Sequence, residues 1–127
     1  MAKVVVVDDS KFLAKLLKSF FEEEGHEVLG IGLDGNEGFE LYKMHQPDLV
    51  TLDLTMPNRD GKDCLSDILL FDSSAKVLIV SAIQEIDVVQ DCLQIGAKGF
   101  LEKPLRFQDE KYREIFHNTV MQALMQS

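Results

Sequence analysis

Five polar side chains stand at the ends of short apolar runs, where buried strands would end: Asp8, Asp9, Asp53, Ser81 and Lys103. Because the carboxyl ends of parallel strands meet at one edge of a sheet, these side chains are expected to lie together. Carboxylates this close repel unless a cation joins them, and a hard divalent ion such as Mg²⁺ takes oxygen ligands. With a hydroxyl and an ammonium group to bind phosphoryl oxygens, the set predicts phosphoryl transfer to Asp53.

Each of these residues has an ordinary structural explanation when it is taken alone. Asp8 and Asp9 stand just before Ser10, and Asp and Ser commonly cap helices. A single Asp at a strand end more often caps a loop than reacts. The prediction depends on all of them falling at the ends of separate strands on one rim.

The hydrophobic pattern predicts five strands that alternate with five helices. The expected strands are residues 4–7, 26–31, 48–53 and 77–80, and a fifth that contains Phe100 and Leu101. Such alternation is typical of a parallel sheet covered by helices on both faces. At this length we expect the α/β, flavodoxin-like doubly wound fold with the five-stranded order 2-1-3-4-5.

Apolar residues at helical spacing place the helices between the strands. The first is expected to begin after a cap at Ser10 and to end at Gly25. Its apolar stripe comprises Phe12, Leu13, Leu16, Leu17, Phe20 and Phe21. Asp34 and Glu37 have the spacing of a capping box for the second helix. Pro57 predicts a loop after the central strand, because proline disfavours helix at the residue before it.

Composition limits the classes of function. The chain has 127 residues, 46% of them hydrophobic, which predicts one folded domain over residues 1–127. A net charge of −9 argues against a nucleic-acid partner, and no apolar run is long enough to span a membrane. The N-terminus has no signal-peptide pattern, so we expect a cytoplasmic protein with Cys64 and Cys92 as buried thiols.

The chain resembles response-regulator receiver domains, and most closely the single-domain, chemotaxis-type (CheY-like) members. The resemblance covers nearly the whole chain. It rests on these matching pieces: Asp8-Asp9, Asp53 followed by Met56-Pro57 and Gly61, Ser81-Ala82, Gly96-Ala97-Lys98-Gly99-Phe100, and Lys103-Pro104.

The resemblance implies a role for each matching residue. Asp53 is the implied phosphoacceptor. Asp9, Asp53 and the backbone carbonyl of Thr55 would hold Mg²⁺, with Asp8 acting through a water. Ser81 and Lys103 would bind the phosphoryl oxygens. Ser81 and Phe100 would form the switch, and the resemblance also suggests a cis bond between Lys103 and Pro104.

The resemblance also implies partners. The phosphodonor would be a phosphohistidine on a sensor histidine kinase. The product would be a signalling protein that assists its own phosphorylation and dephosphorylation, not a conventional enzyme. Its output surface would be the fourth helix, fifth strand and fifth helix, about residues 84–122. A monomer is expected, with a protein target such as a flagellar motor switch. Nothing follows the last helix, which predicts no fused output domain.

Ser81 stands where Thr is also common in the family, and it keeps the hydroxyl. Two further positions, Thr55 and Ile83, concern the lifetime of the phosphate. Thr55 and Ile83 each lie two positions after a site residue and would flank the phosphoryl group. Ile83 is apolar and cannot orient an attacking water.

Three alternatives belong to other classes of protein. Residues 30–35 satisfy G-x-G-x-x-G, with Asp53 near the spacing of a ribose-binding acid, as in a dinucleotide-binding domain. A phosphatase that turns over through a phosphoaspartate needs an acid two residues after the nucleophile, where this chain has Thr55. A pseudo-receiver would bind partners without phosphorylation, which the complete acid set argues against.

Overall fold

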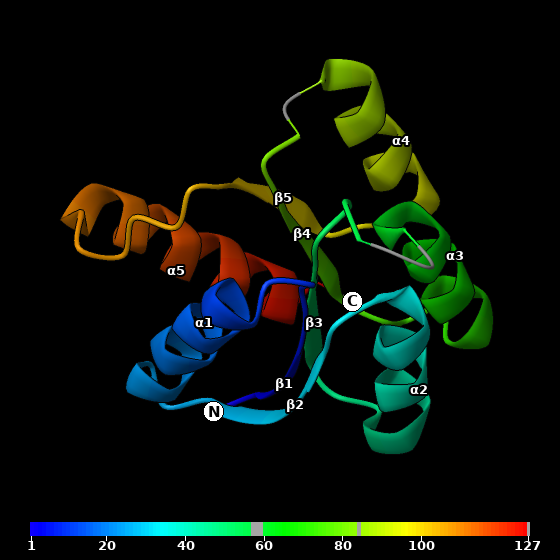
Figure 1. The fold of residues 1–127 in the computed structure, drawn as a ribbon, viewed down its shortest axis with the longest axis horizontal. Helices are drawn as coiled ribbons and strands as arrows, with labels where there is room; N and C mark the ends of the chain where they lie inside the picture. Colours follow the sequence, from blue (N-terminus) through cyan, green and yellow to red (C-terminus); the bar gives the residue numbers. More distant parts are fainter. Residues whose placement is uncertain (57–59, 84, 127) are drawn as a thin grey trace.

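The computed structural model describes residues 1–56, 60–83 and 85–126 (Figure 1). Its strands are β1 (Lys3–Val7), β2 (Glu27–Gly32), β3 (Leu49–Leu52), β4 (Val77–Ser81) and β5 (Gly99–Glu102). Its helices are α1 (Lys11–Glu23), α2 (Gly35–His45), α3 (Gly61–Phe71), α4 (Ile86–Ile95) and α5 (Glu110–Met125). The predicted alternation of strands and helices is confirmed.

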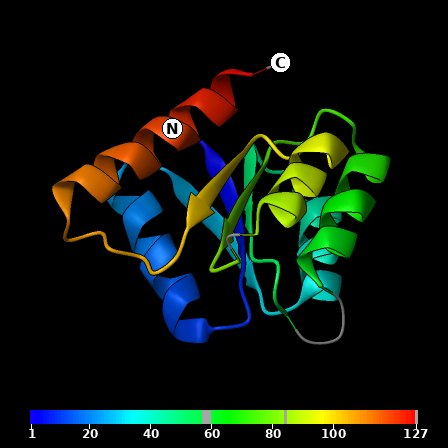
Figure 2. The ribbon, with the colours of Figure 1, turned by 90° about the horizontal axis from the view of Figure 1, so that it is seen from above.

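The strands form one parallel sheet in the order β2-β1-β3-β4-β5, as predicted. Seen from above, α1 and α5 cover one face of the sheet, and α2, α3 and α4 cover the other (Figure 2). Each face has its own apolar core, here called the α1/α5 core and the α2–α4 core. The central strands are buried on both sides, as their continuous apolar runs require.

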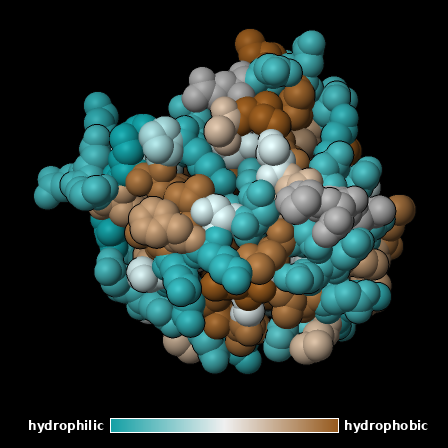
Figure 3. Space-filling model, in the orientation of Figure 1, coloured by the Kyte–Doolittle hydropathy of each residue, from teal (hydrophilic) through white to brown (hydrophobic). Residues whose placement is uncertain are grey.

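Alternate residues of β1 pack into the two cores on opposite faces of the sheet. Val4 and Val6 pack in the α1/α5 core, whereas Val5 and Val7 pack in the α2–α4 core. The edge strand β2 differs, because most of its residues are only half-buried. In the space-filling view, hydrophobic side chains show below the centre, where Figure 1 places β1 and β2 (Figure 3).

The helix ends follow the predicted signals with small differences. Ser10 Oγ accepts a hydrogen bond from Leu13 N–H at 3.2 Å, and Gly25 follows α1 with a φ of 86°. Asp34 accepts from Glu37 N–H at 2.8 Å. The Glu37 carboxylate accepts a hydrogen bond from Leu33 N–H, also at 2.8 Å.

Three boundary or burial predictions are wrong in detail. Strand β2 is shifted by one residue, and β3 is shorter by one residue at each end than residues 48–53. Phe12 is 71% exposed although it was assigned to the apolar stripe of α1. Residues advance by about 100° around a helix, so Phe12 lies on the side away from Ala14, which is buried.

Several smaller predictions can also be checked. Cys64 and Cys92 are both buried. The bond between Lys103 and Pro104 is cis, as expected. Within the described ranges, no helix has the length and apolar character needed to cross a membrane.

Candidate functional site

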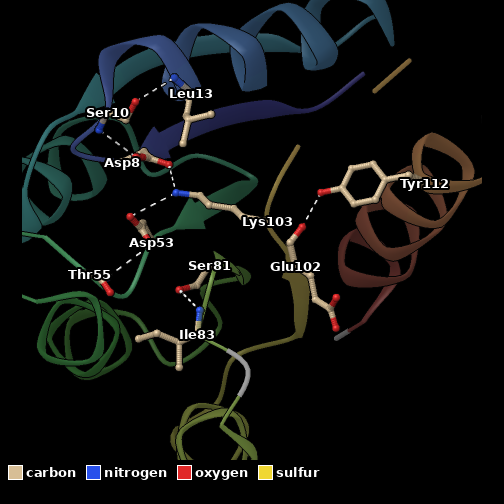
Figure 4. Close-up of polar contacts among 10 residues, drawn as sticks. All are labelled: Asp8, Ser10, Leu13, Asp53, Thr55, Ser81, Ile83, Glu102, Lys103 and Tyr112. Atoms are coloured by element: carbon tan, nitrogen blue, oxygen red, sulfur yellow. Dashed lines mark hydrogen bonds and ion pairs between the residues drawn. The ribbon is translucent and has the colours of Figure 1, made fainter. Parts of the chain in front are cut away.

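The structure brings the predicted polar residues together at the carboxyl edge of the sheet. Carboxylate oxygens of Asp8, Asp9 and Asp53 all lie within 4.8 Å of one another. Ser81 is the last residue of β4, and Lys103 follows the end of β5. Figure 4 shows Asp8, Asp53, Ser81 and Lys103 around one small region. The strand order explains this, since β3 lies between β1 and β4.

Asp53 sits where β3 leaves the sheet. Its N–H donates to the carbonyl of Val7 at 3.0 Å, which ties the residue to β1. Its Oδ1 accepts a weak hydrogen bond from Thr55 N–H at 3.4 Å. The residue is only 5% exposed. Burial raises the pKa of the Asp53 carboxyl and the nearby Asp8 raises it further, while the Lys103 ammonium opposes both.

Lys103 bridges the two buried carboxylates. Its Nζ lies 2.7 Å from Asp8 Oδ2 and 3.3 Å from Asp53 Oδ2 (Figure 4). The other oxygen of Asp8 accepts from Ser10 N–H at 2.9 Å, so Asp8 is held on both sides. Asp9 is exposed, which leaves the cluster open to solvent on its side. Here the ammonium group offsets the repulsion between Asp8 and Asp53.

Ser81 presents its hydroxyl from the neighbouring strand. Its Oγ accepts a hydrogen bond from Ile83 N–H at 3.2 Å (Figure 4). A hydroxyl that accepts one bond can still donate its own hydrogen. Ile83 packs partly buried against the α2–α4 core, as does Phe100. The proposed switch residues Ser81 and Phe100 therefore stand on adjacent strands, β4 and β5.

The backbone of Asp53 and Leu54 approaches Gly61 so closely that only glycine fits there. Gly61 N–H donates to the carbonyl of Leu54 at 3.1 Å. A Cβ added to Gly61 would lie 2.0 Å from the carbonyl oxygen of Asp53. The first residue of α3 therefore fixes the backbone that carries Asp53. Pro57 of the predicted loop lies outside the described residues, and so does Gln84, where the output surface was expected to begin.

The donor set fits a hard divalent cation. Three carboxylates converge, and two of them, Asp8 and Asp53, are buried. Carboxylate oxygens are the ligands that Mg²⁺ prefers, and one or two carboxylates with waters suffice for it. The cation would relieve the burial penalty that raises the pKa of Asp53.

The dinucleotide-binding alternative fits the structure poorly. Gly30 and Gly32 belong to β2, an edge strand. The N–H groups of Leu33 and Glu37, at the start of α2, already donate to carboxylates, where a pyrophosphate would need them. Gly32 has a packing role instead, because a Cβ there would lie 2.9 Å from the backbone nitrogen of Gly38.

Sequence reasoning missed one contact beside the site. Tyr112 is a buried residue of α5. Its hydroxyl donates to the carbonyl of Glu102 at 2.6 Å, one residue before Lys103. Periodicity shows that a tyrosine faces the sheet, but it cannot show which backbone group the hydroxyl meets.

Comparisons with known proteins agree with this geometry. The model of the response regulator receiver domain family matches residues 4–113. Chemotaxis protein CheY of Treponema pallidum (strain Nichols) is 46% identical over 105 residues, 81% of this chain and 73% of that protein. Protein CcdB of Bacillus subtilis (strain 168) is 40% identical over 114 residues, 90% of this chain and 93% of that protein.

A solved structure is similar over almost the entire chain. It is a chain of the CheX–CheY complex with BeF₃ and Mg²⁺ from Borrelia burgdorferi, with a TM-score of 0.90 and 40% sequence identity. The likeness covers 98% of this chain and 90% of that chain.

The raised pKa of Asp53 predicts that Asp53→Asn stabilises the metal-free protein at pH 7. The unfolded chain ionises Asp53 near its ordinary pKa of 3.8, whereas the folded chain holds the proton to higher pH. The carboxyl therefore lowers stability as pH rises through this range, and the amide does not. We expect the melting temperature to rise by about 3–5 °C, as for roughly 1 kcal/mol at this chain length.

Thermal unfolding followed by circular dichroism in EDTA checks this expectation. The advantage of Asp53→Asn should shrink as the pH is lowered toward 3.8, and Mg²⁺ should stabilise wild type more than the variant. The matched control is Asp9→Asn, whose exposed carboxylate carries little burial penalty. If Asp53→Asn melts below wild type in EDTA at pH 7, the Asp53 carboxylate does not destabilise the folded protein and the expectation is wrong.

Proposed function

Because the chain belongs to the family of response regulator receiver domains, we propose that Asp53 accepts a phosphoryl group in the presence of Mg²⁺. One observation carries the proposal. A buried carboxylate with a raised pKa lies beside two further acids, while Lys103 and Ser81 stand at the same edge of the sheet. Phosphoryl transfer asks a protein mainly for position and charge neutralisation, and this set supplies both.

The reaction is a displacement at phosphorus. An Asp53 carboxylate oxygen attacks the phosphorus of a phosphohistidine whose other ring nitrogen is protonated. The bond from phosphorus to the imidazole nitrogen breaks, and neutral imidazole leaves with that electron pair. Asp9, Asp53 and the carbonyl of Thr55 would hold Mg²⁺, with Asp8 acting through a water. When bound, the ion neutralises developing charge on the phosphoryl oxygens.

Lys103 and Ser81 complete the binding of the phosphoryl group. The Lys103 ammonium already lies 3.3 Å from Asp53 Oδ2, so a small movement would bring it to a phosphoryl oxygen. The Ser81 hydroxyl would donate a charge-assisted hydrogen bond to another. Asp8 keeps Lys103 beside the site until then, at 2.7 Å.

The proposed phosphodonor is a sensor histidine kinase, and the proposed pathway is chemotaxis. Support for the pathway comes from the name of the Treponema pallidum relative, a chemotaxis protein. The target would be a protein such as a flagellar motor switch. The phosphatase alternative has less support, because Thr55 stands where a proton-donating acid would be needed.

We propose that the receiver unit extends over residues 1–127, beyond the matched residues 4–113. Helix α5 continues to Met125, and its Val120 and Ala123 are buried in the α1/α5 core. These residues complete the cover of one face of the sheet.

The signal would leave through the face formed by α4, β5 and α5. Phosphate on Asp53 would draw the Ser81 hydroxyl inward, and Phe100 on the adjacent strand would move into the vacated space. Because Phe100 lacks a hydroxyl, burial alone would favour its inward position. Phosphate then shifts the equilibrium by contacts that differ between the two states.

The first test concerns the acceptor. Incubated with acetyl phosphate and Mg²⁺, the wild-type chain should gain one phosphoryl group by intact mass, and hydroxylamine should remove it. Asp53→Asn should gain none, because the nucleophilic carboxylate is gone. The control is Asp87→Asn, which removes an exposed acid of α4 and should leave the gain unchanged. Phosphorylation of Asp53→Asn at the wild-type rate would refute the assignment.

The second test concerns the output face. Beryllofluoride stands in for the phosphoryl group, and amide chemical shifts are compared with and without it in the presence of Mg²⁺. We expect large changes at Ser81 and Phe100 and along α4, β5 and α5. Changes confined to α1 and α2, with Ser81 and Phe100 unmoved, would contradict the proposed switch.

A further inference from the structure

The peptide group between Glu102 and Lys103 is held at both ends. Its N–H, which belongs to Lys103, donates to the carbonyl of Ser81 in β4 at 3.1 Å. Its C=O, which belongs to Glu102, accepts from the Tyr112 hydroxyl of α5 at 2.6 Å (Figure 4). The N–H and C=O of a trans peptide point in opposite directions, so this group is clamped between β4 and α5.

Tyr112 is itself firmly placed. It is 8% exposed, and its ring centre lies 5.8 Å from that of Phe107 and 6.1 Å from that of Phe116. Its backbone N–H donates to the cap residue Asp109 at 3.3 Å. Burial raises the pKa of the Tyr112 hydroxyl, so the group keeps its proton and acts as a donor.

We propose that Tyr112 is a positioning residue for the phosphoryl-binding groups, acting through the Glu102–Lys103 peptide. The Tyr112 hydroxyl fixes the plane from which the Lys103 side chain leaves the backbone. From there Lys103 Nζ reaches Asp8 at 2.7 Å and Asp53 at 3.3 Å. Among the described residues, the Tyr112 hydroxyl bonds the carbonyl of Glu102 and not a carboxylate of the site, so its effect on the site passes through Lys103 and Ser81.

The same clamp includes Ser81. The Ser81 carbonyl accepts the Lys103 N–H, while the Ser81 hydroxyl faces the site. A hydrogen bond to a peptide carbonyl polarises that peptide and strengthens the bond made by its N–H. Loss of the Tyr112 hydroxyl therefore weakens the link between the two residues proposed to bind phosphoryl oxygens. This inference rests on the proposed function of Asp53.

The test is Tyr112→Phe, which removes the hydroxyl and keeps the ring. Beryllofluoride affinity in saturating Mg²⁺ should fall about three- to tenfold, the factor that one hydrogen bond commonly represents. Mg²⁺ affinity without beryllofluoride should stay within twofold of wild type, because the carboxylates are untouched. Calorimetry measures both, and hydrogen exchange of the Lys103 amide should become faster.

The matched control is Tyr42→Phe. Tyr42 is also buried, and its hydroxyl also makes a hydrogen bond, to Asp72 at 2.7 Å. That bond joins α2 to the end of α3, away from Lys103. Tyr42→Phe should leave beryllofluoride affinity and Lys103 exchange unchanged, even if it lowers the melting temperature as much as Tyr112→Phe.

A double variant shows whether Tyr112 acts through Lys103. In a Lys103→Ala background, Tyr112→Phe should cause a smaller further loss of beryllofluoride affinity than in wild type, because the Lys103 side chain is gone and only the backbone link to Ser81 remains. An undiminished loss in that background would contradict a role for Tyr112 in placing the Lys103 side chain. If Tyr112→Phe keeps both the wild-type beryllofluoride affinity and the wild-type exchange rate of the Lys103 amide, the inference is wrong. The proposed function would still stand. If wild type and Asp53→Asn bind beryllofluoride equally, the proposed function fails instead, and the exchange rate of the Lys103 amide still decides whether the clamp exists.

Discussion

Two buried carboxylates, Asp8 and Asp53, share a single ammonium group, and the carboxyl edge of the sheet is arranged around that contact. Lys103 Nζ lies within 3.3 Å of both. Burial of like charges is costly unless a cation compensates them. Here the cation is Lys103, which lies 95 residues after Asp8 in the sequence. The compensation is incomplete, since the pKa of Asp53 is still raised. A site with this imbalance favours additional positive charge.

The fold holds that contact from several directions. Asp53 is tied to β1 through the carbonyl of Val7, and its backbone is packed against Gly61 at the start of α3. Lys103 is tied to β4 through its N–H, and the preceding carbonyl is held by Tyr112 of α5. Helices on both faces of the sheet thus contribute to the placement of the proposed nucleophile and its cation.

Much of this arrangement was predictable from the order of apolar and polar residues. Four of the five strands end at or beside a chemically active side chain, and the parallel order 2-1-3-4-5 then places Asp8, Asp53 and Ser81 together. Features that depend on helix rotation or on backbone contact were not predictable. Phe12 has the right residue type for a core but faces solvent. The partner of the Tyr112 hydroxyl depends on how α5 packs on β5, which no local pattern encodes.

The most direct test of the account is a crystal structure of this protein with Mg²⁺ and beryllofluoride. The account predicts beryllium bound to a carboxylate oxygen of Asp53 and Mg²⁺ held by Asp9, Asp53 and the Thr55 carbonyl. It also predicts that Lys103 Nζ moves from Asp8 to a fluorine, with the Ser81 hydroxyl on another. Beryllofluoride on a different carboxylate, or Lys103 still bridging Asp8 and Asp53 beside an empty Asp53, would contradict it.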